Sequence, residues 1–551
     1  MTNKELAEIL LPDVKYDVNY YEELYPKREL SEEAIVTRFA PSPTGFVHLG
    51  GLLATFIERK MAKQTNGVFF LRIEDTDQKR EVGGGISNII SSLKDYDIEF
   101  DEGPIDDNGN VKGIYGPYIQ SHRKDQYQAL ARKLIEDGYA YPCFCSEDEL
   151  TEIRNKQEAI KDRIGYYGHY AKCRNLTNEE IKAKLDNGEK AVIRLKSPGS
   201  FTNMKVFHDE IKGDVTMPEN DMDIVIIKSD GLPTYHFAHL VDDHFMRTTH
   251  IIRGDEWLPS MPIHVQLFEV SGFDAPKYAH ISPLTKEENG NRRKLSKRKD
   301  PEAACSYYSL KGIPPETVKI YLATVANSNF EEWFMANPDK SVEDFNLTFE
   351  KISSSGSLFD LEKLVNISRN YISKLSANEV YDNVCAWAKK YDNSFLELLE
   401  KHKNYAIDIF NIERLQDKPR KDYAFYSDIK TQIWYMFDEL FESDDKEYEF
   451  KNVNDKETIK LILETYINEF YDENADKETW FNNMKALCDK IGFASDMKAY
   501  KANPENYKGN VSDVSMVLRV ALTSKSMTPD LYDIMRLLGK DRMLERFQNF
   551  M

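Results

Sequence analysis

Two short apolar runs flank a stretch with helical spacing near the start of the chain. Residues 34–40 (AIVTRFA) and 67–75 (GVFFLRIED) are rich in β-forming residues and end in polar ones. Residues 52–64 (LLATFIERKMAKQ) carry apolar side chains at helical spacing, and Gly67 follows just past their end. This order predicts a β-loop-α-β unit, which is typical of a parallel, doubly wound sheet.

A similar pattern returns after residue 221. Residues 222–243 (MDIVIIKSDGLPTYHFAHLVDD) predict a strand, an Asp-Gly turn and a second strand. Residues 249–257 (THIIRGDEW) predict a further strand, followed by a helix from about Ser260. The charged, helix-rich residues 123–221 interrupt these strands and are interpreted as an insertion, and beyond about residue 375 the pattern is almost wholly helical.

Length and composition are those of a multidomain globular protein. With 551 residues the chain exceeds the size of a single core, so two to five domains are expected. No apolar stretch approaches the roughly 18 residues of a membrane span, and residues 1–30 lack the pattern of a secretory signal. Six cysteines are too few for a disulfide framework. A cytoplasmic protein with no membrane partner is therefore expected.

The charge distribution limits how the protein could meet a polyanion. A net charge of −20 argues against non-specific nucleic-acid binding over the whole surface. Residues 285–300 (TKEENGNRRKLSKRKD) are an exception, because they carry seven Lys or Arg against three acidic residues. Alone, such a run is typical of a solvated basic loop.

The loop at 37–51 (TRFAPSPTGFVHLGG) follows the first predicted strand. Ligands of parallel sheets bind at the carboxyl edge, beside helix N-termini. His48 could donate a hydrogen bond to a phosphate there, and Gly50 and Gly51 would let an adenine approach the backbone. By itself, the motif fits a stable Pro/Gly loop with a surface histidine equally well.

Taken together, HLGG (48–51) and KLSKR (294–298) resemble the HIGH and KMSKS signatures of class I aminoacyl-tRNA synthetases. The segments RFAPSPTGFVHLGG, LRIEDTD, KSDGLPTYHFAHLVDDH, IIRGDEWL, KLSKRKD and FDLEKL are similar to glutamyl-tRNA synthetases, in that family's order from Arg38 to about Leu364. Two features depart from the family: about 35 residues precede the first motif, and His239 stands where many relatives have an asparagine.

The resemblance implies an α/β Rossmann-type catalytic domain with a helix-rich insertion, followed by an all-α anticodon-binding region. The expected boundaries are 1–34 for an N-terminal extension, 35–122 and 222–288 for the catalytic domain, 123–221 for an acceptor-end-binding insertion, 289–374 for the KMSKS-type loop and stem-contact domain, and 375–551 for the anticodon-binding domain. Arg414 and the KPRK at 418–421 lie where the family reads the anticodon, although an exposed basic turn explains these charges equally well.

The implied reaction needs no protein nucleophile, because the carboxylate of L-glutamate itself attacks the α-phosphate of ATP. Positioning and charge stabilisation then supply the catalysis, and Mg²⁺ arrives on the ATP phosphates. The resemblance assigns catalysis to His48, Lys294 and Lys297, with Lys297 facing the α-phosphate and the leaving pyrophosphate. It assigns ATP binding to His48, Gly50, Gly51, Glu256, Trp257 and Lys297.

Glutamate binding is assigned to Arg38, Ala40, Ser42, Glu74, Tyr235, His239 and Arg253. A guanidinium pairs bidentately with a carboxylate, so Arg38 and Arg253 suit the acidic substrate. Glu74 could receive the ammonium group and Tyr235 could orient the side chain. Outside the family motifs, a strand-end Arg or Glu is more often part of a surface ion pair.

A possible metal site lies within the insertion. Cys143, Cys145, His169 and Cys173 offer the thiolate and imidazole ligands of a tetrahedral, structural Zn²⁺. Tyr167 or Tyr170 could replace His169 as the fourth ligand. Three reduced cysteines packed in a core are the alternative.

The preferred interpretation is a monomeric glutamate–tRNA ligase that uses ATP and charges tRNA(Glu), with tRNA(Gln) left open as a second acceptor. A glutaminyl-tRNA ligase is disfavoured by LRIEDTD, and a shorter tRNA-modifying relative by the chain length. A non-catalytic tRNA-binding paralogue is disfavoured by the intact motif residues. A small-molecule nucleotidyltransferase would not need the C-terminal helices.

Overall fold

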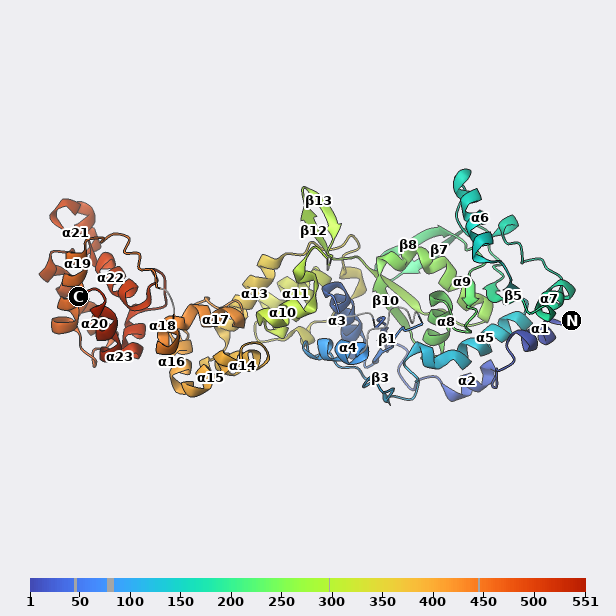
Figure 1. Cartoon of the computed structure of the whole chain (residues 1–551), viewed down its shortest axis with the longest axis horizontal. Helices are drawn as coiled ribbons and strands as arrows, with labels where there is room; N and C mark the ends of the chain where they lie inside the picture. The colour runs from blue at the N-terminus through green and yellow to red at the C-terminus, as the bar shows by residue number, and fades with distance from the viewer. Residues whose placement is uncertain (44–46, 77–83, 297, 444–445) are drawn as a thin grey trace. The chain divides into compact units, whose positions relative to one another are not determined.

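The structure is a computed structural model that describes residues 1–43, 47–76, 84–296, 298–443 and 446–551 (Figure 1). The chain forms two compact units. The first comprises Met1–Tyr307 and Val318–Leu361, and the second comprises Tyr308–Thr317 and Glu362–Met551.

The first unit contains all thirteen described strands. They are β1 (Val36–Phe39), β2 (Val68–Leu71), β3 (Gly103–Pro104), β4 (Val111–Lys112), β5 (Ala140–Cys143), β6 (Val192–Leu195), β7 (Met204–Asp209), β8 (Gly213–Pro218), β9 (Val225–Ile227), β10 (His250–Gly254), β11 (Lys277–Ile281), β12 (Thr285–Glu288) and β13 (Asn291–Lys294). Helices up to residue 307 are α1 (Asn3–Leu10), α2 (Val18–Leu24), α3 (Leu49–Gln64), α4 (Gly85–Lys94), α5 (Lys124–Glu136), α6 (Glu147–Ala159), α7 (Asn178–Asp186), α8 (Tyr235–Phe245) and α9 (Met261–Ser271). Farther along the chain come α10 (Cys305–Lys311), α11 (Pro315–Ala326) and α12 (Phe330–Ala336).

The predicted β-loop-α-β unit is confirmed. Strands β1 and β2 pair in parallel with Val36 opposite Val68, and α3 connects them. Gly67 ends the connection where the chain passes very close to β1, since a Cβ on Gly67 would lie 1.9 Å from the carbonyl oxygen of Ile35. Only glycine fits this approach, so the turn into β2 depends on it.

The region after residue 221 differs from its prediction in one element. The expected first strand is β9, which pairs antiparallel with β6 of the insertion. The expected second strand is wrong, because residues 235–245 form helix α8. Buried side chains, polar ones included, cover almost all of α8, so it has no solvent-exposed polar face of the kind that marks a surface helix.

The next strand and helix agree with the prediction. Strand β10 pairs in parallel with β11, and Arg253 stands opposite His280. Helix α9 begins at Met261, beside the predicted start at Ser260.

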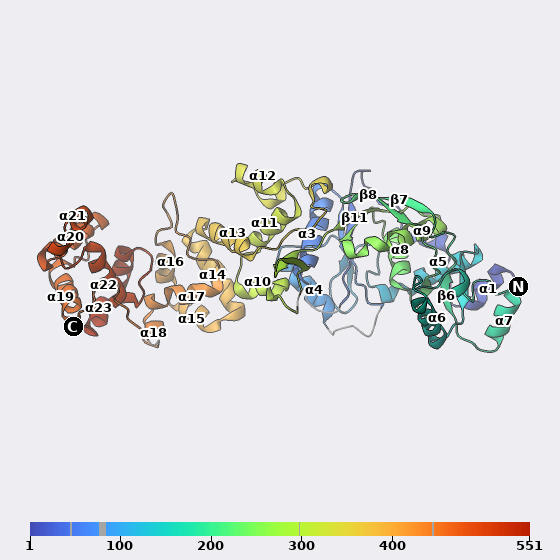
Figure 2. The same ribbon diagram turned by 90° about the horizontal axis from the view of Figure 1, so that it is seen from above.

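The segment 123–221 contains α5, α6 and α7 and also strands β5 to β8. Strands β7 and β8, of six residues each, pair antiparallel as a hairpin. Figures 1 and 2 both show α7 beside the N-terminal helix α1. Leu6, Tyr21 and Tyr25 join the hydrophobic core that also contains residues of α5 and α8, so the N-terminal extension is an integral part of this unit.

The second unit is helical in the residues that the structure describes, as predicted. Its helices are α13 (Leu361–Lys374), α14 (Ala377–Tyr391), α15 (Asn393–Lys401), α16 (Lys403–Asn411), α17 (Tyr426–Ile433), α18 (Asp438–Phe441), α19 (Lys456–Thr465), α20 (Lys477–Ile491), α21 (Met497–Ala502), α22 (Val511–Thr523) and α23 (Leu531–Gln548). Across the described parts of both units, no helix combines the length and apolar character that crossing a membrane requires.

Arg414 has a structural role in this unit. Its guanidinium donates hydrogen bonds to the carbonyl oxygens of Phe410, Ile372 and Leu375 at 2.7 to 2.8 Å. These bonds satisfy carbonyls at the C-terminal ends of two helices, which otherwise lack intrahelical partners. Arg420, within the KPRK segment, pairs with Glu413 and Asp422.

Candidate active site

A cavity of about 550 Å³ lies in the first unit, beside the carboxyl ends of β1, β10 and β11. Twelve of the fourteen residues predicted for catalysis, ATP or glutamate line it: Arg38, Ala40, Ser42, His48, Gly50, Gly51, Glu74, Tyr235, Arg253, Glu256, Trp257 and Lys294. His239 lies behind the cavity wall. Lys297 lies outside the described residues.

His48 sits at the N-cap of α3, where its Nδ1 accepts a hydrogen bond from the backbone N–H of Gly51 at 2.8 Å. This contact satisfies one of the helix's unpaired N–H groups. The imidazole of His48 lies close to the backbone of Gly50, since a Cβ on Gly50 would lie 3.3 Å from His48 Nδ1. The absence of side chains on Gly50 and Gly51 therefore leaves room for the His48 ring beside the first turn of α3.

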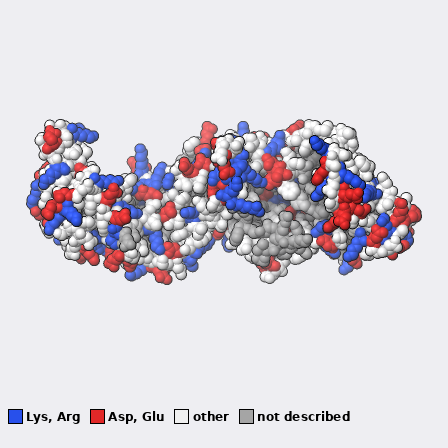
Figure 3. Space-filling model, turned by 45° about the horizontal axis from the view of Figure 1, so that its top comes forward, with Lys and Arg blue, Asp and Glu red and all other residues white. Residues whose placement is uncertain are grey.

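Lys294 and Glu256 meet at the mouth of the cavity. Lys294 ends β13, and its Nζ lies 3.1 Å from Glu256 Oε1, with both side chains more than half exposed. Strand β13 pairs antiparallel with β12, and Figure 3 shows Lys and Arg side chains gathered over this hairpin. The predicted basic patch is thus a β-hairpin beside the cavity.

Arg38 reaches the cavity from β1 and is held by a buried aspartate. Its Nε donates to Asp243 Oδ1 at 3.0 Å, and Arg72 Nη1 donates to the same oxygen at 2.8 Å. Burial alone would raise the pKa of Asp243, but Arg38 and Arg72 hold it well below its ordinary value. One ionised carboxylate therefore fixes two buried guanidinium groups.

Glu74 follows β2 and accepts a hydrogen bond from Arg72 Nη2 at 3.1 Å. Burial raises its pKa above the ordinary glutamate value. Its backbone N–H donates to the carbonyl oxygen of Pro41, which ties the end of β2 to the loop after β1. The carboxyl group lines the cavity at the same end as Arg38.

Tyr235 begins α8 and stacks on Trp257, with 4.3 Å between ring centroids. His239 lies one helical turn later, is 1% exposed, and is absent from the residues that line the cavity. Its Nε2 contacts the Tyr278 hydroxyl at 3.1 Å, and its Nδ1 lies 2.9 Å from Asp243 Oδ2. The structure thus places His239 in the supporting layer, away from direct contact with a ligand in the cavity.

Arg253 lies near the end of β10, a strand that contacts the Arg38 strand β1. Its Nε donates to His280 Nε2 at 2.9 Å, while Nη1 has no hydrogen-bond partner among the described residues. The side chain is 7% exposed and lines the cavity. A buried guanidinium with an unsatisfied donor indicates a place for an anion.

Two family models match this chain. The family model for the catalytic domain of class I tRNA synthetases (E and Q) matches residues 34–366, and the model for an anticodon binding domain matches residues 394–551. The chain belongs to the class I tRNA synthetases of the E and Q group.

Individual relatives match nearly the full length of this chain. A glutamate–tRNA ligase of Clostridium beijerinckii is 48% identical and covers 100% of both chains. That of Sorangium cellulosum is 40% identical over 96% of this chain and 97% of its own. A crystal structure of a glutamate tRNA ligase from Elizabethkingia meningosepticum, in complex with its amino acid, has 28% identity and a TM-score of 0.76 over 94% of this chain and 99% of that one.

Several residues that build the synthetase's cavity were not predicted from the sequence. Asp243 looks like part of an acidic turn after an apolar run, and Glu58 looks like one charge on the exposed face of a helix. In the structure, Glu58 is 2% exposed and lines the cavity, and burial raises its pKa well above the ordinary value. Only the spacing of His239 and Asp243, four residues apart, could have suggested a shared helical face.

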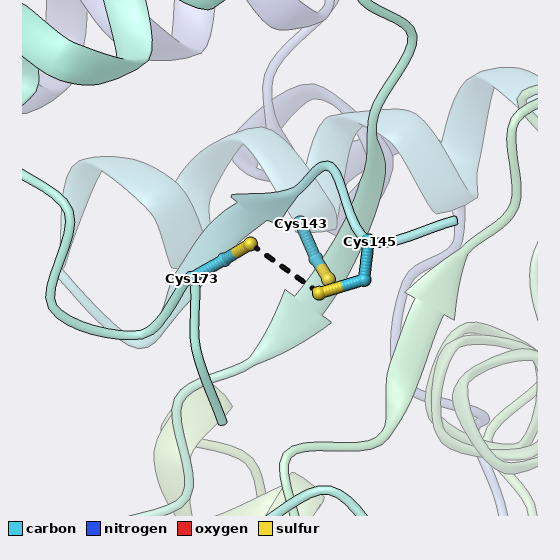
Figure 4. Close-up of side chains that lie close together, drawn as sticks. All are labelled: Cys143, Cys145 and Cys173. Atoms are coloured by element: carbon cyan, nitrogen blue, oxygen red, sulfur yellow. Dashed lines mark hydrogen bonds between the residues drawn. The ribbon is translucent and has the colours of Figure 1, made fainter. Parts of the chain in front are cut away.

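The three cysteines predicted as metal ligands form a cluster in the first unit. Ligand atoms of Cys143, Cys145 and Cys173 all lie within 4.8 Å of one another, and Cys145 Sγ lies 3.7 Å from Cys173 Sγ (Figure 4). The Tyr166 hydroxyl lies 3.5 Å from Cys143 Sγ and 3.3 Å from Cys145 Sγ. His169 is exposed and outside this cluster, with its ring against Tyr170.

Proposed function

We propose that the protein is a glutamate–tRNA ligase. It activates L-glutamate with ATP to glutamyl-adenylate and transfers the glutamyl group to the 3′ end of tRNA(Glu), releasing AMP and diphosphate. The observation that carries this proposal is the single cavity that brings together two buried arginines and the His48 and Lys294 side chains. Relatives matched over their full length are glutamate–tRNA ligases.

The arginine end of the cavity binds the amino acid. Arg253 and Arg38 pair with the substrate carboxylates, and Glu74 accepts from the ammonium group. Tyr235 forms the wall against the substrate side chain, and Ala40 and Ser42 close the loop side. Glutamine is rejected because its neutral amide cannot return a charge-assisted bond to a guanidinium.

The opposite end binds ATP. His48 donates toward a phosphate oxygen, Gly50 and Gly51 allow the adenosine to approach the helix start, and Glu256 and Trp257 line the nucleotide side. Mg²⁺ travels with the ATP phosphates and neutralises part of their charge. Lys294 and Lys297 stabilise the charge that builds up as the α-phosphate is attacked.

The lysine role is tested with Lys297→Ala. We expect aminoacylation to fall by about a hundredfold or more, the typical loss when one preorganised donor is removed. Binding of tRNA, measured by filter retention, should stay near the wild-type level. Lys299→Ala in the same motif is the matched control, and an unchanged rate in Lys297→Ala would remove that residue from the catalytic set.

The activity itself is tested by charging purified tRNA(Glu) and tRNA(Gln) with labelled glutamate and with labelled glutamine. We expect glutamate on tRNA(Glu) and no charging with glutamine. Charging of tRNA(Gln) with glutamate would add that tRNA as a second acceptor. Charging with glutamine alone would overturn the proposal in favour of a glutaminyl-tRNA ligase.

The tRNA is expected to contact three further regions. Residues 123–221 bind the acceptor end, 289–374 contact the stem beside the basic hairpin, and 375–551 bind the anticodon. The match of an anticodon binding model to residues 394–551 supports the last of these assignments. A monomer in the cytoplasm is the state in which we expect the enzyme to act, and sedimentation equilibrium would test the monomer.

We also propose a structural Zn²⁺ on the cysteine cluster. The three converging thiols supply three of the four ligands of a structural zinc site, and the Tyr166 hydroxyl is the polar group beside two of them. Zn²⁺ would hold the insertion's fold around Cys143, Cys145 and Cys173, with Tyr166 in place of His169 as the neighbouring donor. Metal analysis should give about one equivalent per chain, reduced in Cys145→Ser and unchanged in His169→Ala; less than about half an equivalent in the wild type contradicts the site.

A further inference from the structure

Arg253 is held by a buried histidine and a buried aspartate that the proposed reaction does not use. His280 is the cross-strand neighbour of Arg253 in the β10–β11 pair, and its Nε2 accepts from Arg253 Nε at 2.9 Å. On the other side of the ring, His280 Nδ1 lies 2.6 Å from Asp209 Oδ2. Both His280 and Asp209 have no exposed surface.

The chemistry of these groups fixes the direction of the hydrogen bonds. The Nε–H of Arg253 can only donate, so His280 Nε2 must be an unprotonated acceptor. In the neutral ring, the proton then resides on Nδ1, where the Asp209 carboxylate accepts it. The same carboxylate that orients the ring therefore also selects the tautomer that can hold Arg253.

Asp209 cannot turn away from this arrangement. It ends β7, and its carboxylate accepts hydrogen bonds from the backbone N–H groups of Ile211 at 3.0 Å, Lys212 at 2.8 Å and His280 at 3.1 Å. The β7–β8 hairpin thus anchors the aspartate, the aspartate anchors the histidine, and the histidine anchors the arginine.

We propose that Asp209 and His280 are positioning residues that set the selectivity for a substrate carboxylate by fixing Arg253. This inference rests on the proposed role of Arg253 in glutamate binding. Because Nε is occupied by His280, only the two terminal nitrogens of the guanidinium remain for a ligand. Nη1 has no partner among the described residues, and Nη2 makes only a long contact of 3.5 Å with the Trp257 carbonyl oxygen.

An end-on guanidinium distinguishes acids from amides. Its two terminal N–H groups match the two oxygens of a carboxylate, whereas an amide offers one oxygen acceptor and one nitrogen donor. A guanidinium free to rotate about its side chain could present a single donor to an amide and lose this preference. Fixing Nε therefore contributes to selectivity as well as to affinity.

The test distinguishes the two ring nitrogens of His280. His280→Gln places an amide oxygen near the position of Nε2 and retains an acceptor for Arg253, whereas His280→Asn reaches only the Nδ1 position and removes that acceptor. We expect His280→Asn to raise the KM for glutamate by about 10- to 100-fold, the usual effect of losing a hydrogen bond to a charged group. His280→Gln should recover most of this loss, and the KM for ATP should stay within about twofold in both variants.

Asp209→Asn gives an independent measurement. Its amide can donate to Nδ1 and so favours the tautomer with a proton on Nε2, which would oppose the Arg253 N–H. We expect a rise in glutamate KM similar to that of His280→Asn and a smaller preference for glutamate over glutamine. Asp214→Asn is the matched control, because Asp214 forms an exposed pair with His208 at 2.7 Å on the same hairpin and should leave both KM values unchanged.

The outcomes separate this inference from the site on which it rests. If Arg253→Ala raises the glutamate KM but His280→Asn and Asp209→Asn do not, the positioning role is wrong and the site stands. If Arg253→Ala also leaves the glutamate KM unchanged, the proposed site itself is wrong. Equal losses in His280→Gln and His280→Asn, with lower melting temperatures and equal rises in both KM values, would reduce His280 to a packing residue and overturn the inference.

Discussion

The two ends of the cavity that we propose bind glutamate and the ATP phosphates hold their charged side chains in different ways. At the glutamate end, Arg38 and Arg253 are 4% and 7% exposed, and each is fixed by a buried partner. At the phosphate end, Lys294 and Glu256 form a single ion pair with side chains 58% and 52% exposed. We call the first the rigid end, because its charged side chains are buried and held by fixed partners, and the second the open end, because its charged side chains are exposed to water.

This difference matches two chemical tasks. Selecting one amino acid requires donors that are already aligned, because a neutral competitor is rejected only if buried polar groups would be left unpaired. Triphosphate binding and pyrophosphate release require groups that can change partners. Exposed ion pairs exchange at little cost, whereas buried ones do not.

The largest expected effect comes from removing the anchor of the rigid end. Asp243→Ala leaves Arg38 and Arg72 buried without their common counterion, so we expect the free energy of unfolding to fall by about 3–5 kcal/mol. Urea denaturation measures this change. Glu152→Ala, which removes an exposed pair with Lys156, is the control and should cost under about 1 kcal/mol; an equal loss in the two variants would erase the contrast.

Arg253→Ala should act on substrate binding. Truncating one partner of a buried, hydrogen-bonded charge typically costs about 2–5 kcal/mol, so kcat/KM for glutamate should fall at least thirtyfold, or about 2 kcal/mol. The KM for ATP should change little, which steady-state pyrophosphate exchange at varied glutamate and ATP would reveal. Wild-type dependence on glutamate would contradict the assignment of this end.

The next effect in size is expected from acidification, which should lower the free energy of unfolding through buried histidines near the rigid end. Burial lowers the pKa of His239 to about 3 and that of His236 to about 4, so both are neutral in the folded protein. Below about pH 6.5 the unfolded chain binds protons that the folded protein does not, and stability falls by about 1.4 kcal/mol per pH unit for each histidine until the folded pKa is reached. His239→Asn should therefore have a shallower loss of unfolding free energy between pH 6 and 4; a slope equal to the wild type would show that His239 is not the titrating group.

The smallest effect is expected at the open end. Glu256→Gln removes the ion pair with Lys294, and the free energy of unfolding should change by under about 1 kcal/mol because water screens the pair. Denaturation at low and high salt checks the same point, since added salt should diminish even this difference. A loss comparable to that of Asp243→Ala would mean that the two ends are not held differently.

Local patterns were sufficient to predict the elements that carry the motifs. Helix α3 and its flanking strands follow from a helical apolar period between two short β-rich runs. Helix α8 was mistaken for a strand because its polar residues, such as His239 and Asp243, are buried with the apolar ones and mark no solvent-exposed face. An element buried on every side can be assigned only from its tertiary surroundings.

The residues of the candidate site likewise divide into those that local sequence patterns predicted and those that they did not. Residues at loop and strand ends, such as His48 and Arg253, were predicted because their chemistry stands out beside glycines and apolar runs. Asp243, Asp209 and His280 were missed because each is an ordinary polar residue until the fold buries it. The arginine partners of Asp243 and the two members of the Asp209–His280 pair lie far apart in the sequence, so no local spacing reveals these pairings.

The hydrogen bond that starts α3 also decides which atom of His48 is presented to a ligand. Since Nδ1 is occupied in accepting from Gly51, a neutral imidazole carries its hydrogen on Nε2. The start of the helix thereby leaves the Nε2–H of His48 as the donor that a ligand can meet. Lysine or arginine in this position would bring a positive charge but could not accept from the Gly51 N–H, so the first turn of the helix would lose its cap while the phosphate kept a donor.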